Sequence, residues 1–186
     1  MSWGILLQPD LILGDSVLSL TLEMLKQNNI KGLVLDVDDT LVHFRSVEVS
    51  EEVQQWIQSL KPFVRIWLVS NNMSRHRIQH IATILDVPFI VGARKPSRRK
   101  LRQALKAMQL PVAQVAMVGD RLFTDVLAGN RLGMFTVLVE PMTLPSLTDR
   151  KSIVRVLEVW LSRILGATMP KQHKYSKLNE STEREI

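Results

Sequence analysis

One short segment decides the fold: residues 32–40, which read GLVLDVDDT. The run from Gly32 to Leu35 has no polar interruption, which is typical of a strand buried on both faces of a parallel sheet. Two acidic residues, Asp36 and Asp38, follow directly and are two positions apart. Because alternate residues of an extended chain point to the same side, we expect the two carboxylates to face the same way.

Short apolar segments bounded by turn residues recur along the chain, over residues 64–69, 88–91, 115–118 and 135–139. Segments with helical spacing of apolar residues separate them. We expect an N-terminal helix over about 15–29, capped by Asp15 or Ser16, and a last helix over about 150–165. The other helices are expected to open at Ser50, Ser74, Ser97, and Thr124 or Asp125. This alternation predicts an α/β fold, a three-layer Rossmann-like parallel sheet with helices on both faces.

Polar residues follow four of the predicted strands, at the edge where open parallel sheets bind ligands. In chain order they are Asp36 to Thr40, Ser70-Asn71-Asn72, Gly92-Ala93-Arg94-Lys95-Pro96, and Gly119 to Asp125. Carboxylates, a hydroxyl, an amide and an ammonium group are therefore expected to converge at one edge of the sheet.

The acidic residues of these clusters predict a metal site. Asp36 and Asp38 would repel each other in a bare protein. A hard divalent cation relieves such repulsion, and ligands that are all oxygens suit Mg²⁺. Asp120, at the end of the neighbouring predicted strand, is the natural third ligand, and Asp125 is a further candidate. We therefore expect Mg²⁺ to be held by Asp36, Asp38 and Asp120.

The order of the four clusters resembles the haloacid dehalogenase (HAD) superfamily of phosphohydrolases, over about residues 30–140. The matching positions are Asp36 to Thr40 for the first motif, Asp-x-Asp-x-Thr, then Ser70, then Lys95 before Pro96, then Gly119-Asp120 with Thr124-Asp125. An Asp-rich turn by itself is often only a solvated turn. Four motifs in order, each after a predicted strand, favour catalysis.

The resemblance implies a mechanism that passes through an aspartyl-phosphate. Asp36 would attack the phosphorus, and Asp38 would protonate the leaving oxygen and then deprotonate the hydrolytic water. Lys95 would neutralise charge on Asp36 and on the phosphoryl group. By the same resemblance, the main-chain carbonyl of Asp38 would help to hold Mg²⁺. The candidate phosphate-binding residues are Ser70, Asn71 and Thr40, the last two with loop shaping as the alternative.

Two other groups of polar residues have less support as functional sites. His76 and His80 are four positions apart, but the segment lacks the Glu of a metalloprotease helix, and we interpret both histidines as solvent-facing. A triad of Ser70, His43 and an aspartate has no Gly-x-Ser-x-Gly turn to support it.

Composition narrows the class of protein and its partners. The chain has 186 residues and no cysteine, which excludes disulfides, thiol nucleophiles and cysteine metal sites. It carries 24 Lys and Arg against 18 Asp and Glu, a net charge of +6, which favours anionic partners. Residues 87–119 contain seven basic residues and no acidic one. They form either a solvated helix face or a positive rim joined by Arg75 and Arg77.

One domain is expected over residues 1–169, with its core over about 30–165 and a disordered tail over 170–186. The apolar stretch 1–14 lacks a cationic n-region, so we do not expect a signal peptide, and no run is long enough to span a membrane. We expect a cytoplasmic protein that at most lies on a membrane surface, through its N-terminal segment or its last helix.

The spacing of the motifs predicts an enzyme with no cap domain. Only residues 41–69 and 71–94 separate the first three motifs, too few for the cap that encloses small substrates in many HAD enzymes. The whole-chain pattern resembles capless subclass IIIA phosphatases of the YqeG type, which are related to phosphatidylglycerophosphatases. This resemblance implies a phosphatase of phospholipid metabolism that converts phosphatidylglycerophosphate to phosphatidylglycerol at an anionic membrane surface.

Two alternatives stay open. One is a HAD phosphatase that acts on soluble sugar phosphates or nucleotides. The other is a non-catalytic basic module that binds RNA or protein. The intact acidic set of Asp36, Asp38 and Asp120 counts against a nucleic-acid partner, because binding alone does not require these three carboxylates together.

Overall fold

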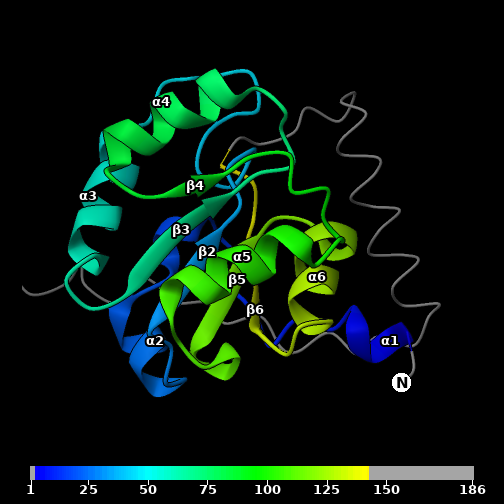
Figure 1. The fold of residues 1–186 in the computed structure, drawn as a ribbon. Helices are drawn as coiled ribbons and strands as arrows, with labels where there is room; N and C mark the ends of the chain where they lie inside the picture. The colour runs from blue at the N-terminus through cyan, green and yellow to red at the C-terminus, as the bar shows by residue number, and fades with distance from the viewer. Residues whose placement is uncertain (1–2, 143–186) are drawn as a thin grey trace, which may run out of the picture.

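The computed structural model describes residues 3–142, which form a six-stranded sheet between two layers of helices (Figure 1). The strands are β1 (Leu11–Ile12), β2 (Gly32–Leu35), β3 (Arg65–Val69), β4 (Phe89–Ile90), β5 (Val115–Gly119) and β6 (Phe135–Leu138). They lie in the order β1-β6-β5-β2-β3-β4, and every neighbouring pair is parallel. The predicted fold class is confirmed. The predicted last helix and the predicted disordered tail lie outside the described residues.

The path of the chain through the sheet reverses once beside β2. From β2 the chain proceeds outward through β3 to β4, and it then returns to the other side of β2 with β5 and β6. Strands β2 and β5 are paired in register, Leu35 opposite Val118. Open parallel sheets bind ligands where the strand order reverses, at the carboxyl ends of the strands. This topology therefore locates the candidate site at the ends of β2 and β5.

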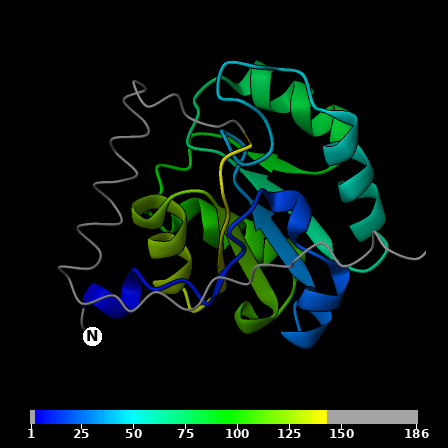
Figure 2. The same cartoon turned by 180° about the vertical axis from the view of Figure 1, so that it is seen from behind.

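Side chains alternate across the sheet and build two hydrophobic layers. Leu33 and Leu35 of β2 face the layer formed by the short 3-10 helix η1 (Val17–Ser19), α2 (Leu22–Gln27), α3 (Glu51–Leu60) and α4 (Arg75–Leu85). Val34 faces the opposite layer, with α5 (Arg99–Met108) and α6 (Leu127–Asn130). Figure 1 shows α5 and α6 in front of the sheet, and Figure 2 shows the face behind it, with α2 in blue. Because both faces are covered, the strands are mostly apolar, with Arg65 in β3 and Thr136 in β6 as polar members.

The predicted single helix over about 15–29 is wrong. It is divided into η1 and α2, and Leu20 between them is extended, at φ −78° and ψ 101°. The cap of α2 is Thr21, whose side chain accepts a hydrogen bond from the Met24 N–H, instead of Asp15 or Ser16. A buried side chain explains the break, because the Trp56 indole Nε1–H donates to the Leu20 carbonyl at 2.9 Å. The contact stabilises the extended conformation of Leu20, in which its carbonyl is directed toward Trp56 of α3.

Other boundaries differ in detail. Ser50 and Ser74 cap α3 and α4 as expected, since their side chains accept hydrogen bonds from Val53 and Arg77 N–H groups. Helix α5 begins at Arg99, with Arg98 and not Ser97 at the cap. Thr124 and Asp125 do not open the next helix, which begins as the π-helix η3 (Leu122–Val126) and continues into α6.

The N-terminal segment contributes two elements that the sequence pattern did not predict, helix α1 (Trp3–Leu6) and edge strand β1. The Asp10 carboxylate accepts hydrogen bonds from the backbone N–H and the hydroxyl of Thr136 in β6. The Asn130 amide donates to the carbonyls of Leu6 and Gln8. Polar contacts far apart in sequence thus attach this segment to the sheet. Within residues 3–142, no helix combines the length and the apolar character that a membrane span requires.

We predict that Trp56→Phe destabilises the protein by about 1–3 kcal/mol, because it leaves the buried Leu20 carbonyl without its donor. Chemical denaturation measures the loss in the free energy of unfolding. The matched control is Trp67→Phe, since the Trp67 indole has no hydrogen bond to any residue of the described range. Equal losses for the two variants would contradict the explanation of the helix break.

Candidate active site

The first acidic residue of the site continues the pairing of β2. Asp36 directly follows that strand, and its N–H donates to the Val118 carbonyl of β5 at 2.9 Å. Behind it, residues 37–42 form a tight turn in which the N–H groups of Leu41 and Val42 both donate to the Val37 carbonyl. Asp39 in this turn is left-handed, with φ +64°. The turn closes the end of β2 and keeps Asp36 against the neighbouring strand.

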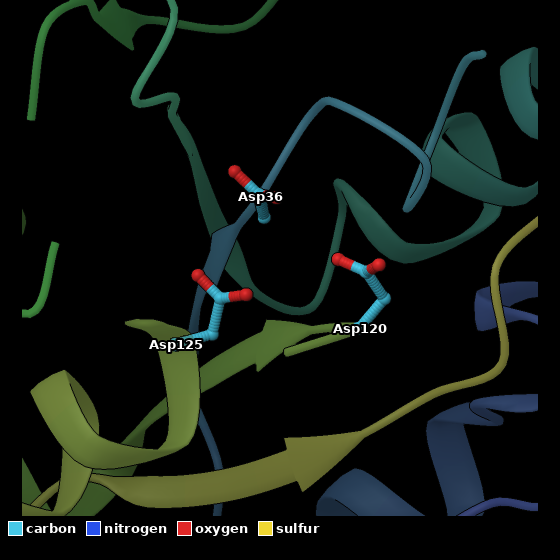
Figure 3. A group of neighbouring side chains, drawn as sticks. All are labelled: Asp36, Asp120 and Asp125. Atoms are coloured by element: carbon cyan, nitrogen blue, oxygen red, sulfur yellow. The ribbon is translucent and has the colours of Figure 1, made fainter. Parts of the chain in front are cut away.

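Three carboxylates gather at this edge of the sheet. Asp36, Asp120 and Asp125 are all buried, and each offers one oxygen within 4.8 Å of the other two. Asp36 follows β2, Asp120 follows β5, and Asp125 comes from the π-helix η3. Figure 3 shows the three side chains directed toward a common space. The expected convergence of acidic groups from separate clusters is therefore present, and it is made by these three residues.

Burial and the charges of neighbouring carboxylates raise the pKa of two of these residues, Asp36 and Asp120. Burial raises the pKa of Asp36 to about 7, where Lys95 counteracts the shift and Asp125 adds to it. Burial also raises the pKa of Asp120 to about 8, with further contributions from the charges of Asp125 and Asp36. Close like charges in a water-poor site favour the neutral form. A cation bound at this place would therefore stabilise the ionised carboxylates.

Lys95 is the positively charged side chain that contacts two of the three carboxylates, those of Asp36 and Asp125. Its Nζ lies 2.6 Å from Asp36 Oδ1, 2.7 Å from Asp125 Oδ1 and 2.9 Å from the Val69 carbonyl oxygen. An ammonium group has three N–H donors, so three oxygens match its capacity. Burial lowers the pKa of Lys95, but the charges of Asp125 and Asp36 outweigh burial and raise it overall. Lys95 is therefore a permanent cation here.

The backbone of Lys95 is fixed by Asn71. The Asn71 side-chain Oδ1 accepts from the Lys95 N–H at 2.7 Å, and its Nδ2 donates to the Lys95 carbonyl at 3.2 Å. Both ends of the Asn71 amide are thus engaged with one residue of the loop after β4. In this arrangement Asn71 shapes the loop that carries Lys95, which is the alternative given for it above.

The oxygen donors of the acidic group fit Mg²⁺. Asp120 Oδ1 and Asp125 Oδ2 are buried and accept no hydrogen bond from residues 3–142. Buried carboxylate oxygens without a donor are costly. Hard oxygen ligands from a small number of carboxylates are the set that Mg²⁺ takes in proteins. Asp36, Asp120 and Asp125 are therefore the residues of this site suited to hold the metal.

The Asp38 carboxylate lies apart from this group. Its Oδ2 accepts from the Ser70 hydroxyl at 2.9 Å, and its Oδ1 accepts from Arg77 Nη1 at 2.7 Å. The side chain of Asp38 is 22% exposed, against 9% for Asp36. The sequence grouped Asp38 with Asp36 and Asp120 as metal ligands, whereas the structure directs its carboxylate to β3 and α4.

Ser70 and Thr40 are fully buried. The Ser70 hydroxyl donates to Asp38 and accepts from the Asn72 N–H at 2.9 Å. The Thr40 hydroxyl is buried without a hydrogen-bond partner in the described range. Ser70 therefore contacts Asp38 directly, and the triad with His43 is not formed, because the hydroxyl of Ser70 points to a carboxylate and His43 Nδ1 accepts from the Arg45 N–H.

Arg77 is the site residue that sequence reasoning placed wrongly. One of the two alternatives for the basic residues joins Arg77 to an exposed positive rim, but Arg77 is buried, with 9% exposure, and forms an ion pair with Asp38. A signal for this was present in the spacing. Arg77 precedes Ile81 by four positions and therefore shares the apolar face of α4. A basic residue on a buried face requires an acidic partner nearby.

The remaining basic and histidine residues behave as surface groups. His76 and His80 are exposed, as expected. Arg94, Arg99, Arg102 and Lys106 are exposed as well. Two hydrogen bonds link the start of α5 to the end of α6. Arg98 donates to the Arg131 carbonyl, and Arg131 donates to the Pro96 carbonyl.

The intervals between motifs contain few elements. Between the turn at 37–42 and β3 lie a loop and helix α3, and between β3 and Lys95 lie helix α4 and strand β4. A cap domain would be inserted in one of these two intervals. Each of them contains one helix and the strand that follows it.

Comparisons with known proteins agree on one family. The model of the family described as "Mitochondrial PGP phosphatase" matches residues 6–143. The chain is 36% identical over 159 residues to "Probable phosphatase YqeG" of Bacillus subtilis (strain 168), which is 85% of this chain and 90% of that protein. It is 31% identical over 151 residues to "Phosphatidylglycerophosphate phosphatase 1, chloroplastic" of Chlamydomonas reinhardtii, which is 75% of this chain and 55% of the algal protein. The chain thus spans about half the length of the algal relative.

Among solved structures, hypothetical protein XCC2798 from Xanthomonas campestris resembles the chain with a TM-score of 0.51 at 17% identity. The likeness covers 66% of this chain and 72% of that one. At this identity the likeness concerns the fold alone, and it agrees with the parallel α/β sheet described above.

We predict that the metal-free protein loses stability as pH rises from about 4 to about 8, because Asp36 and Asp120 bind protons more tightly when folded than their usual pKa of 3.8 allows. In that window the folded state holds more protons than the unfolded state, so each rise in pH favours unfolding. Thermal unfolding with and without Mg²⁺ measures the effect. Mg²⁺ should raise Tm more near the alkaline end of the window, where protons compete least.

The matched control for this prediction is Asp120→Asn, which removes one titrating carboxylate and one candidate ligand. It should flatten the pH dependence and weaken the stabilisation by Mg²⁺. A wild-type Tm that Mg²⁺ leaves unchanged at every pH would contradict the assignment of these carboxylates to a metal site.

Proposed function

Because the chain belongs to the mitochondrial PGP phosphatase family and is a phosphatase of the HAD type, we propose that it hydrolyses a phosphomonoester of a lipid through an aspartyl-phosphate on Asp36. The resemblance drawn from the four motifs is confirmed at the level of the family. The observation that carries the proposed mechanism is the position of Asp36, buried between Lys95 and the other carboxylates at the reversal of the sheet.

The first step is attack by Asp36. An oxygen of its carboxylate forms a bond to the substrate phosphorus as the bond from phosphorus to the leaving oxygen breaks. Lys95, 2.6 Å from Asp36 Oδ1, favours the ionised form of the nucleophile against the effect of burial and offsets negative charge near it. Mg²⁺ held by Asp36 and Asp120, with Asp125 beside them, would neutralise charge on the phosphoryl oxygens.

Asp38 is the proposed acid and base. It delivers a proton to the leaving oxygen in the first step, and it takes a proton from water in the second. The oxygen of that water then bonds to phosphorus, the bond to Asp36 breaks, and inorganic phosphate leaves. Asp38 is suited to this role because its side chain keeps some exposure to solvent while Asp36, two residues earlier, is more deeply buried.

The proposed lipid substrate, phosphatidylglycerophosphate, is supported by the family description and by the surface around the site. The loop after the first motif, the segment after β3 and the loop after β4 are close together. Arg77 of α4 donates to the carbonyls of His43 and Ser46, and the Gly92 N–H donates to the Asn72 carbonyl. These loops carry the exposed apolar side chains of Val47 and Met73. Arg45 and Arg94 in these loops are exposed, as is Arg75 at the start of α4. Apolar and basic side chains together suit an anionic membrane surface.

We predict that Asp36→Asn abolishes hydrolysis of phosphate esters, by about 10³-fold or more in kcat, because the amide cannot form the covalent intermediate. The measurement is release of inorganic phosphate, together with detection of a phosphorylated enzyme after acid quench. The matched control is Asp86→Asn, at an exposed position at the end of α4. Normal turnover by Asp36→Asn, or a phosphoenzyme formed elsewhere, would contradict the assignment.

We predict that phosphatidylglycerophosphate in mixed micelles has a higher kcat/KM than sugar phosphates, nucleotides or phosphopeptides, because the exposed arginines and apolar side chains near the site fit a headgroup presented at a surface. A parallel assay of these substrates, each with Mg²⁺ and with a chelator, measures the preference. A clear preference for sugar phosphates or nucleotides would favour the soluble alternative. Absence of Mg²⁺-dependent turnover on all of them would favour the non-catalytic module.

A further inference from the structure

We propose that Arg77 is a positioning residue that holds the carboxylate of Asp38 in the orientation needed to protonate the leaving oxygen. The inference rests on the proposed function, since it gives Arg77 a role through Asp38. It differs from the four motifs, none of which includes a residue of helix α4.

The contacts of Arg77 are directed entirely at the site and its bordering loop. Nη1 donates to Asp38 Oδ1 at 2.7 Å, Nε donates to the Ser46 carbonyl at 2.8 Å, and Nη2 donates to the His43 carbonyl at 3.0 Å. Every nitrogen of the guanidinium group is therefore engaged. The residue joins α4, the loop after the first motif and the acidic residue of that motif.

Because Arg77 is buried, its contacts with polar groups hold its side chain in place. Within residues 3–142 the buried basic residues are Arg77 and Lys95, and each pairs with one aspartate of the first motif. Lys95 contacts Asp36, and Arg77 contacts Asp38. A buried guanidinium without an anion would be strongly unfavourable. The ion pair therefore fixes the Arg77 side chain, and through it the position of Asp38.

The Asp38 carboxylate is held on both oxygens. Ser70, at the end of β3, donates to Oδ2, and Arg77 donates to Oδ1. Donors from two different elements leave the side chain little freedom to rotate. A carboxyl group that must meet a leaving oxygen gains from such fixed geometry, because small displacements of catalytic groups slow reactions strongly.

This role has a specific kinetic signature. A phosphate ester with a good leaving group, such as p-nitrophenyl phosphate, departs without much help from an acid, whereas phenyl phosphate needs proton donation more. Loss of Arg77 should therefore reduce kcat mainly for the poor leaving group. A residue that only supports folding would reduce both activities alike.

The experiment compares Arg77→Met and Arg77→Lys with the wild type on these two esters. We expect Arg77→Met to lower kcat for phenyl phosphate by about 10²-fold and for p-nitrophenyl phosphate by less than about 5-fold, as for partial loss of acid catalysis. Arg77→Lys keeps a charge near Asp38 but loses the fork that reaches two carbonyls, and should show an intermediate loss. The matched control is Lys26→Met, since Lys26 is an exposed basic residue of helix α2 that contacts the Phe63 ring.

A combination with Asp38→Asn separates failure of this inference from failure of the proposed function. If Asp38→Asn itself shows no selectivity for the poor leaving group, the acid role of Asp38 in the proposed function is wrong. If Asp38→Asn is selective but both Arg77 variants reduce the two activities equally, or raise them, positioning by Arg77 is overturned. The expected result is that Arg77→Met adds little to Asp38→Asn, because both act on one step. If Arg77→Met does not fold, Arg77→Lys carries the same comparison.

Discussion

The ammonium group of Lys95 is the interaction on which the site depends. It lies 2.6 Å from Asp36 and 2.7 Å from Asp125, with its side chain only 1% exposed. Three buried carboxylates in one place would repel one another and would be poorly solvated. Lys95 compensates for part of this negative charge. The charge that remains uncompensated contributes to the raised pKa values of Asp36 and Asp120, and it favours binding of a divalent cation.

The sheet makes this concentration of charge achievable. Strands β2 and β5 are paired in register, so the residues that follow them emerge at the same height. The strand order reverses at this pair, which is where open parallel sheets bind ligands. The loop after β4 brings Lys95 across β3, and Asn71 fixes its backbone by two hydrogen bonds. Four segments far apart in sequence therefore contribute to one small volume.

A division of labour follows between the two aspartates of the first motif. Asp36 lies with the other carboxylates and Lys95, whereas Asp38 turns toward Ser70 and Arg77. Although they are two residues apart, they face different partners, because the chain leaves the extended conformation of β2 in the turn at 37–42, where the Val37 carbonyl accepts from the Leu41 and Val42 N–H groups. A nucleophile and an acid–base group require different surroundings. The structure provides each aspartate with a buried cation of its own.

Sequence patterns predict five of the six strands in the described range, the parallel α/β class, the HAD family, and the positions of Asp36 and Asp120 directly after strands and of Lys95 in the loop after β4. Local signals suffice for these, since buried parallel strands are continuous apolar runs and the motifs directly follow them. Tertiary structure alone decided the break at Leu20, the strand at 11–12, the inclusion of Asp125 in the acidic group and the partner of Asp38. Each depends on a side chain from a distant segment, namely Trp56, Thr136, Lys95 and Arg77. No periodicity within a segment encodes which distant residue will meet it, because that contact exists only once the sheet has brought the segments together.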